Sequence, residues 1–262
     1  MPTKISQPTA PVPIQRAIAV AAQRTGTDFG YLFDQARIES GFRPQARATT
    51  SSAAGLYQFT RQTWLAILKQ HGAEHGFGWA ADSIEKTPGS RYRVTDPVQR
   101  EQILQLRFDP DAAALMAGEL AGDNAVHLAD VLGHAPESVD LYLAHFLGAH
   151  GARKFLTAWQ TDPQQAAAPL LPEAARANPA IFYAPDGTPR SVDAIRARFA
   201  SKFGGLSDLA VTATSARDVR QSASVSANQL GLRSIRPMPH RLSLAFAQDA
   251  YRSLQSREGG AL

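Results

Sequence analysis

The chain has 262 residues, of which 44% are apolar and 19% charged, so it contains enough apolar material for a sizeable core. Its 27 basic and 23 acidic side chains leave a formal net charge of +4, which suits an anionic polymer but is too small to predict nucleic-acid binding. Cysteine is absent, which excludes disulfides, thiolate metal sites and a cysteine nucleophile.

The N-terminal segment, residues 1–11, is expected to be flexible and carries no recognisable secretory signal. Pro8, Pro11 and Pro13 interrupt this part of the chain, and the apolar run that follows, Ala17–Ala22, is too short for a signal core. No segment approaches the roughly 18 apolar residues of a membrane span. We therefore expect neither nucleic acid nor stable membrane insertion among the interactions of this chain.

Helix start and stop signals are frequent and strand signals are scarce, so the sequence predicts an all-α domain over residues 12–204. The expected start signals are Thr60, Asp96–Pro97, Asp109–Pro110 and Ala135–Pro136. The expected stop signals include Gly41 and Gly148. In chain order, helices are predicted over 14–22, 30–40, 60–68, from 110 through 120, 136–148, 150–160 and 192–203.

The composition changes after Gly204–Gly205. Residues 205–262 begin as a stretch rich in Ser, Ala and Thr, which is typical of a linker or flexible tail. Within it, Arg241–Gln255 has apolar residues at every fourth position and predicts a terminal helix. This tail is a candidate for docking on a secretion or flagellar apparatus.

The segment HGAEH (residues 71–75) matches H-x-x-E-H, the pattern of one class of zinc proteases. That chemistry requires both imidazoles on one face of a continuous helix, together with a third ligand. Gly72 lies inside the motif, and Gly76 and Gly78 follow it, so a continuous helix is not expected. We interpret the motif as a polar, glycine-rich loop, and we expect no metal and no other cofactor.

Glu39 is the strongest candidate for a catalytic group. It lies in the last turn of the helix predicted over 30–40, and the residues that share its face (Leu32, Gln35 and Ala36) are uncharged. Burial and the negative end of the helix dipole both raise the pKa of a carboxyl group. Both effects favour a protonated acid near neutral pH, as a general acid requires. A solvated glutamate at a helix end is the alternative.

The chain reads ESGFRPQA at residues 39–46, AAGLYQ at 53–58, RFDP at 107–110 and AHFLG at 144–148. This resembles soluble lytic transglycosylases and goose-type lysozyme-like proteins, whose patterns are E-S-x-F-x-P-x-A, G-A-x-G-L-M-Q, L-F-D-P and A-Y-N-x-G. The resemblance covers about Ile14 to Gly151. It implies an all-α, lysozyme-like transglycosylase domain.

Three features depart from the family pattern. The loop before Gly55 is one residue longer, and Tyr57 stands where the family has methionine. His145 and Phe146 replace a Tyr-Asn pair whose tyrosine hydroxyl supports the catalytic glutamate. An imidazole can also donate a hydrogen bond, so His145 is one candidate for that role, with a groove-lining position as the alternative. Tyr142, one turn earlier, is the other candidate.

The resemblance implies cleavage of the β-1,4 bond between N-acetylmuramic acid and N-acetylglucosamine in peptidoglycan, in the periplasm or cell envelope. Glu39 would act first as acid and then as base, and the product would carry a 1,6-anhydro ring. Asp28 and Asp34 do not share its helical face, whereas Glu119 and Asp123 remain options for a second carboxylate.

The residues expected to bind the glycan share positions in or near the family motifs. They are Ser40, Ser52, Gly55, Tyr57, Gln58, Phe59, Tyr142 and His145. A further segment, residues 172–183, resembles an extension of some bacterial and prophage members and is expected to pack on the groove. Two alternatives stay open: a lysozyme-type hydrolase on the same fold, and a non-catalytic peptidoglycan-binding or assembly protein.

Overall fold

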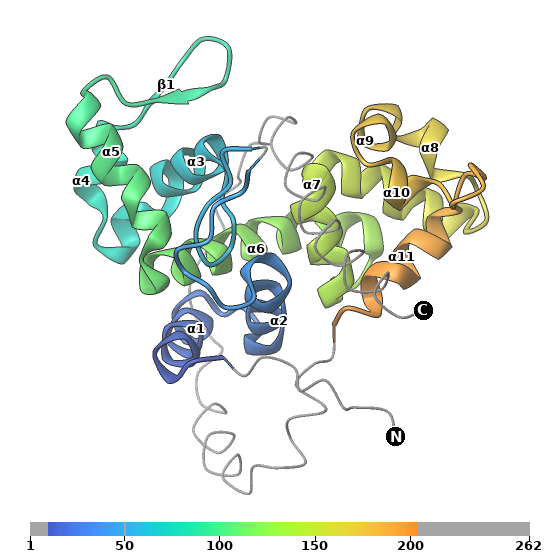
Figure 1. Ribbon diagram of the computed structural model, residues 1–262, viewed down its shortest axis with the longest axis horizontal. Coiled ribbons are helices and arrows are strands. Elements are labelled where there is room, and N and C mark those ends of the chain that lie inside the picture. The colour runs from blue at the N-terminus through green and yellow to red at the C-terminus, as the bar shows by residue number, and fades with distance from the viewer. Residues whose placement is uncertain (1–9, 50, 204–262) are drawn as a thin grey trace, which may run out of the picture.

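The computed structural model describes residues 10–49 and 51–203, which are mainly helical (Figure 1). The elements in chain order are α1 (Val12–Thr25), α2 (Phe29–Ser40), α3 (Arg61–His71), the 3₁₀ helix η1 (Gly72–His75), α4 (Gly78–Ser83), β1 (Glu85–Lys86), β2 (Tyr92–Arg93), α5 (Pro97–Gln105), the 3₁₀ helix η2 (Leu106–Phe108), α6 (Pro110–Leu132), α7 (Ser138–Thr161), α8 (Ala167–Leu170), α9 (Pro172–Ala177), α10 (Pro179–Phe182) and α11 (Val192–Ala200). Strands β1 and β2 form a two-stranded antiparallel ribbon. The predicted all-α character is confirmed.

Two segments with predicted features lie wholly or partly outside the described residues. These are residues 1–9 of the N-terminal segment and the tail at 205–262, with its expected helix at 241–255. Within the described residues, no helix combines the length and apolar character needed to cross a bilayer.

Most helices begin where the sequence predicts. Thr60 Oγ1 accepts a hydrogen bond from the backbone N–H of Thr63, and the Asp96 and Asp109 carboxylates accept from first-turn amides of α5 and α6. Each of these side chains satisfies amides that have no partner inside the helix. The predicted starts at Thr60, Asp96 and Asp109 are therefore confirmed.

Helix α7 begins later than predicted. Its cap is Glu137 rather than Ala135, because the Asp140 carboxylate accepts from the Glu137 backbone N–H at 3.0 Å. Gly148 has φ 72° and ψ 158° and divides α7 into two helical segments, which confirms the predicted stop. Helix α11 ends at Ala200, three residues before the predicted end. The residues that follow the helix lie beside the site described below.

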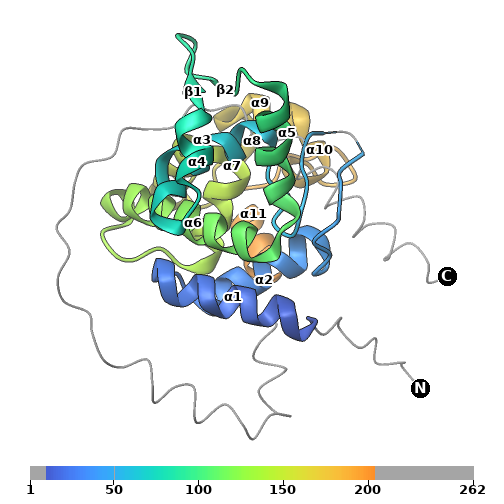
Figure 2. The same cartoon turned by 90° about the vertical axis from the view of Figure 1, so that its left-hand side faces the viewer.

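Helix α6 forms the centre of the fold and packs most extensively against α1 and α7 (Figures 1 and 2). Its N-terminal half is rich in buried alanine, and these small side chains allow neighbouring helices to approach closely. Helix α11 packs in turn on α7. This arrangement brings together the end of α2, the first half of α7 and the residues that follow α11.

Candidate active site

Glu39 projects from the last turn of α2 into the protein. The helix begins at Asp28, whose carboxylate accepts from the Tyr31 backbone N–H at 2.8 Å, and ends at Gly41, which adopts the left-handed conformation (φ 59°). Leu32 and Ala36, on the same helical face, are fully buried. The Glu39 side chain is 0% exposed, so the expected burial is confirmed and the solvated alternative is wrong, although polar side chains, described below, lie at the carboxyl.

Two side chains of α7, three residues apart, face the Glu39 carboxyl. His145 Nε2 lies 3.1 Å from Glu39 Oε1, which is within ion-pair distance. The Tyr142 hydroxyl reaches the same carboxyl, and the Tyr142 ring stacks on His145 with centroids 5.9 Å apart. Both residues proposed from the sequence as supporting groups therefore lie at the acid.

Burial raises the pKa of the Glu39 carboxyl above its ordinary value of 4.5. The charge and hydrogen bonding of His145, the charge of Lys202 and the Tyr142 hydroxyl oppose this shift but are outweighed. Burial also raises the pKa of Tyr142, and the negative charge of Glu39 adds to that effect. The site therefore holds Glu39 in its protonated form to higher pH than water would, which suits a proton donor.

Lys202 and Phe203, which were not predicted from the sequence as site residues, lie beside this site. Burial lowers the pKa of Lys202 to about 8, although the Glu39 charge supports its protonated form. The Phe203 ring lies 6.2 Å from the Tyr31 ring and 5.4 Å from the Tyr142 ring, measured between centroids. No local pattern marks these two residues, because their position depends on how α11 packs against α7.

The loop that follows Glu39 is braced by Arg107, which is 5% exposed. Its guanidinium donates to the backbone carbonyls of Ser52 at 2.8 Å and Phe59 at 3.2 Å. Gly55 has φ +85°, and a Cβ there would lie 1.8 Å from the Arg107 carbonyl oxygen, so glycine is required. The Gln58 amide donates to the Gly55 carbonyl at 2.8 Å and braces the same loop.

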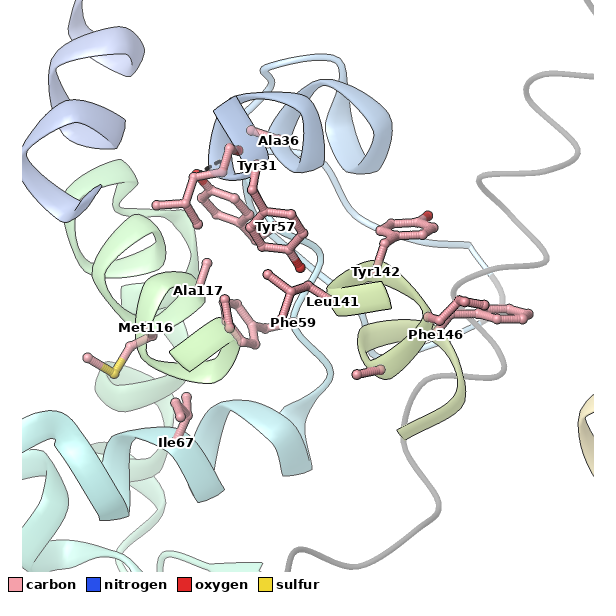
Figure 3. Packing of buried hydrophobic residues seen from close by; sticks show 14 of the residues in the cluster. Tyr31, Ala36, Tyr57, Phe59, Ile67, Met116, Ala117, Leu141, Tyr142 and Phe146 are labelled. Atoms are coloured by element: carbon pink, nitrogen blue, oxygen red, sulfur yellow. Dashed lines mark hydrogen bonds between the residues drawn. The ribbon is translucent and has the colours of Figure 1, made fainter. Parts of the chain in front are cut away.

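Of the residues expected to touch the glycan, Ser40, Tyr57 and Phe59 are buried, and the half-buried Ser52 bonds to the backbone instead. Ser40 Oγ donates to the Leu56 carbonyl at 2.8 Å, and Ser52 Oγ accepts from the Arg61 backbone N–H at 3.2 Å. Tyr57 and Phe59 are packed in the core (Figure 3), so neither offers an exposed ring face to a sugar in this structure. These side chains shape the loop beside Glu39, and only Tyr142 and His145 of the expected set reach the acid itself.

Within the described residues, no carboxylate is among the groups that act most strongly on the pKa of Glu39. The groups that shift its pKa are His145, Lys202 and Tyr142. Glu119 and Asp123, the options raised from the sequence, instead contact histidines near the end of α3. The site as described therefore has one carboxylic acid, one imidazole, one phenol and one ammonium group.

Residues able to hold a cation lie elsewhere, at HGAEH. Helix α3 ends at His71 and η1 follows, so the prediction that this motif is not one continuous α-helix is confirmed, whereas its interpretation as a loop is wrong because residues 72–75 form a 3₁₀ helix. Within the described chain, His71, Glu74 and Glu119 form a group with ligand atoms close enough to share an ion.

A scan of the sequence against models of known protein families finds no match.

Proposed function

We propose that the chain is a peptidoglycan lytic transglycosylase in which Glu39 is the only acid and base. The observation that carries this proposal is a fully buried carboxyl group with a raised pKa, beside His145 and Tyr142, whose pKa is affected most by burial and by groups other than carboxylates. The motifs that resemble soluble lytic transglycosylases centre on the same glutamate.

One carboxylate is sufficient for this reaction. Protonated Glu39 donates its proton to the oxygen that links N-acetylmuramic acid to N-acetylglucosamine, and that bond breaks. The acetamido oxygen of the substrate stabilises the positive anomeric carbon. Glu39, now a carboxylate, accepts the proton of the muramoyl 6-hydroxyl, whose oxygen attacks the anomeric carbon and closes the anhydro ring. The acid is regenerated and no water is consumed.

The surroundings of Glu39 favour the protonated acid before proton transfer and the carboxylate after it. Burial favours the acid before proton transfer. His145 and Tyr142 favour the carboxylate that follows, because a cationic or donor group at the oxygen stabilises negative charge. Two-carboxylate mechanisms place a second Asp or Glu within about 10 Å of the first, either as a nucleophile or to activate water. No Asp or Glu is among the described groups that act most strongly on the pKa of Glu39, which favours the intramolecular route over hydrolysis.

Substrate must reach a carboxyl group that is covered in this conformation. The cover is Lys202 and Phe203, and the aromatic contacts of Phe203 with Tyr31 and Tyr142 hold it in place. Aromatic pairs of this kind contribute about 0.5–1.5 kcal/mol each beyond the apolar area that they bury. Within this proposal, the glycan strand binds where these two residues move aside.

The proposal is tested by incubating purified peptidoglycan with the full-length chain and with Glu39→Gln. We expect the wild type to release soluble muropeptides and the variant to release at least 10²-fold less, since the amide has no proton to donate. Equal release would remove Glu39 from the mechanism. No release by either protein, with binding to peptidoglycan retained, would favour a non-catalytic peptidoglycan-binding protein.

A further inference from the structure

A second cluster of ionisable side chains lies where the end of α3 and η1 face α6. It contains His71, Glu74, His75, Glu119 and Asp123. His71 and His75 are the two histidines of HGAEH, and Glu119 and Asp123 are one turn apart on α6. None of the five takes part in the chemistry proposed for Glu39.

The ligand atoms in this cluster lie close enough together to surround a small divalent ion, and one pair lies at the separation that such an ion requires. The nearest ligand atoms of His71, Glu74 and Glu119 all lie within 4.8 Å of one another. His71 Nδ1 is 3.3 Å from Glu119 Oε2. A tetrahedral ion with bonds of about 2.0–2.2 Å separates its ligand atoms by roughly 3.3–3.6 Å. The space between these atoms therefore fits an ion of this kind without a large rearrangement.

Asp123 and His75, the other two residues of the cluster, orient the ligand atoms. His71 Nε2 lies 3.1 Å and 3.2 Å from the two oxygens of Asp123, so a proton on Nε2 is shared with that carboxylate and the Nδ1 lone pair is left for a ligand. His75 Nε2 lies 2.6 Å from Glu119 Oε1, which leaves Oε2 directed at His71. A carboxylate behind a ligating histidine is a common device that fixes its tautomer and raises metal affinity.

The ligand types narrow the choice of ion. One imidazole and two carboxylates suit Zn²⁺ or a similar first-row ion better than Ca²⁺, which prefers oxygen ligands alone. The three carboxylates of the cluster exceed the charge that its two imidazoles can offset, so the cluster attracts cations. The protease arrangement is absent here, because His75 is directed to Glu119 rather than to the shared space.

We infer that His71, Glu74 and Glu119 form a structural site for a divalent transition-metal ion such as Zn²⁺, with Asp123 and His75 as the residues that orient the ligands. The bound ion connects the end of α3 and η1 to α6. It stabilises the fold and leaves the proton chemistry of Glu39 unchanged.

The test is a Zn²⁺ titration of the full-length chain in competition with a chromophoric chelator, together with thermal unfolding with and without Zn²⁺. We expect one equivalent of Zn²⁺ to bind and to raise the unfolding temperature. Glu119→Gln and His71→Gln are expected to abolish both effects. His134→Gln changes an exposed histidine outside the cluster and is expected to bind like the wild type.

Asp123→Asn keeps all three ligands and is expected to weaken Zn²⁺ binding about 10–100-fold. If His71→Gln does not fold, Asp123→Asn still tests whether the cluster binds Zn²⁺. The inference is overturned if the wild type binds no Zn²⁺ stoichiometrically, in which case the cluster is an ion-pair network only. It is also overturned if folded Asp123→Asn binds Zn²⁺ as tightly as the wild type, or if His134→Gln loses binding equally.

Discussion

Glu39 Oε1 lies 3.1 Å from His145 Nε2, across the contact between the last turn of α2 and the first half of α7. The imidazole stands where the resembling family has a tyrosine, and a tyrosine, Tyr142, lies beside it on the same helix and reaches the same carboxyl. The acid is thus supported by two side chains with different chemistry, and each can be removed separately.

We expect His145→Leu to slow muropeptide release about 10-fold or more, because the carboxylate formed after proton transfer loses a stabilising neighbour. The charge and hydrogen bonding of His145 lower the pKa of Glu39, so the basic limb of the pH–rate profile should move to higher pH. The measurement is muropeptide release as a function of pH, with His134→Gln as control. An unchanged rate and profile would show that His145 only lines the site.

Tyr142→Phe removes a hydroxyl at Glu39, and Tyr57→Phe provides a matched control. Tyr142→Phe should also move the basic limb of the pH–rate profile to higher pH, because that hydroxyl lowers the pKa of Glu39. The Tyr57 hydroxyl donates to the Leu32 carbonyl at 3.1 Å, so its loss should lower the free energy of unfolding by about 1 kcal/mol or more. The Tyr57 variant should keep the wild-type pH profile. If both variants shift it equally, the effect of Tyr142 is not local to the acid.

Glu39 also makes the stability of the fold depend on pH. Its pKa is higher in the folded chain than the ordinary value of 4.5, so the folded state binds this proton more tightly than the unfolded state. Stability therefore falls as pH rises from about 4.5 through the raised pKa. Below that window the group is protonated in both states, and the cost disappears.

We accordingly expect Glu39→Gln to be more stable than the wild type at neutral pH, with a gain that disappears below pH 4.5. Urea unfolding at the two pH values measures this difference. Glu85→Gln, at an exposed pair with Arg93, is the control and should change stability little at either pH. A variant less stable than the wild type at neutral pH would mean that ionised Glu39 stabilises the fold.

Phe203→Ala tests whether the segment after α11 restricts access. Removing its contacts with Tyr31 and Tyr142, at about 0.5–1.5 kcal/mol each, should favour the open state by roughly 5- to 150-fold. We expect Phe203→Ala to lower KM for soluble glycan strands and to leave the basic limb of the pH–rate profile at nearly the same pH. Phe29→Ala, whose ring contacts Phe33 outside the cover, is the control. A higher KM in Phe203→Ala would show that this ring binds the glycan instead of covering the acid.

Much of the helical framework is predictable because its signals are local. Asp96 and Asp109 each cap a helix through hydrogen bonds within the next few residues, and Gly148 interrupts α7 by its own backbone conformation. The burial of Glu39 is predictable for a similar reason, since the uncharged face of α2 contains Leu32 and Ala36.

What depends on tertiary contacts could not be predicted. The sequence does not show which face of the loop after Glu39 points inward, so Tyr57 and Phe59 were assigned to the glycan although they belong to the core. Lys202 comes to Glu39 only through the packing of α11 on α7. That Glu119 and Asp123 lie beside the histidines of HGAEH likewise depends on how α3 and η1 pack against α6, which nothing near the motif in the sequence indicates.

The central claim is that one acid closes an anhydro ring without water, and the mass of the products tests it most directly. Purified peptidoglycan is digested by the wild type in isotopically heavy-oxygen water, and the soluble muropeptides are analysed by mass spectrometry. We predict muramoyl ends that are lighter by one water molecule than reducing ends and that carry no heavy oxygen. Reducing ends labelled with solvent oxygen would contradict the claim and identify a hydrolase at the same glutamate.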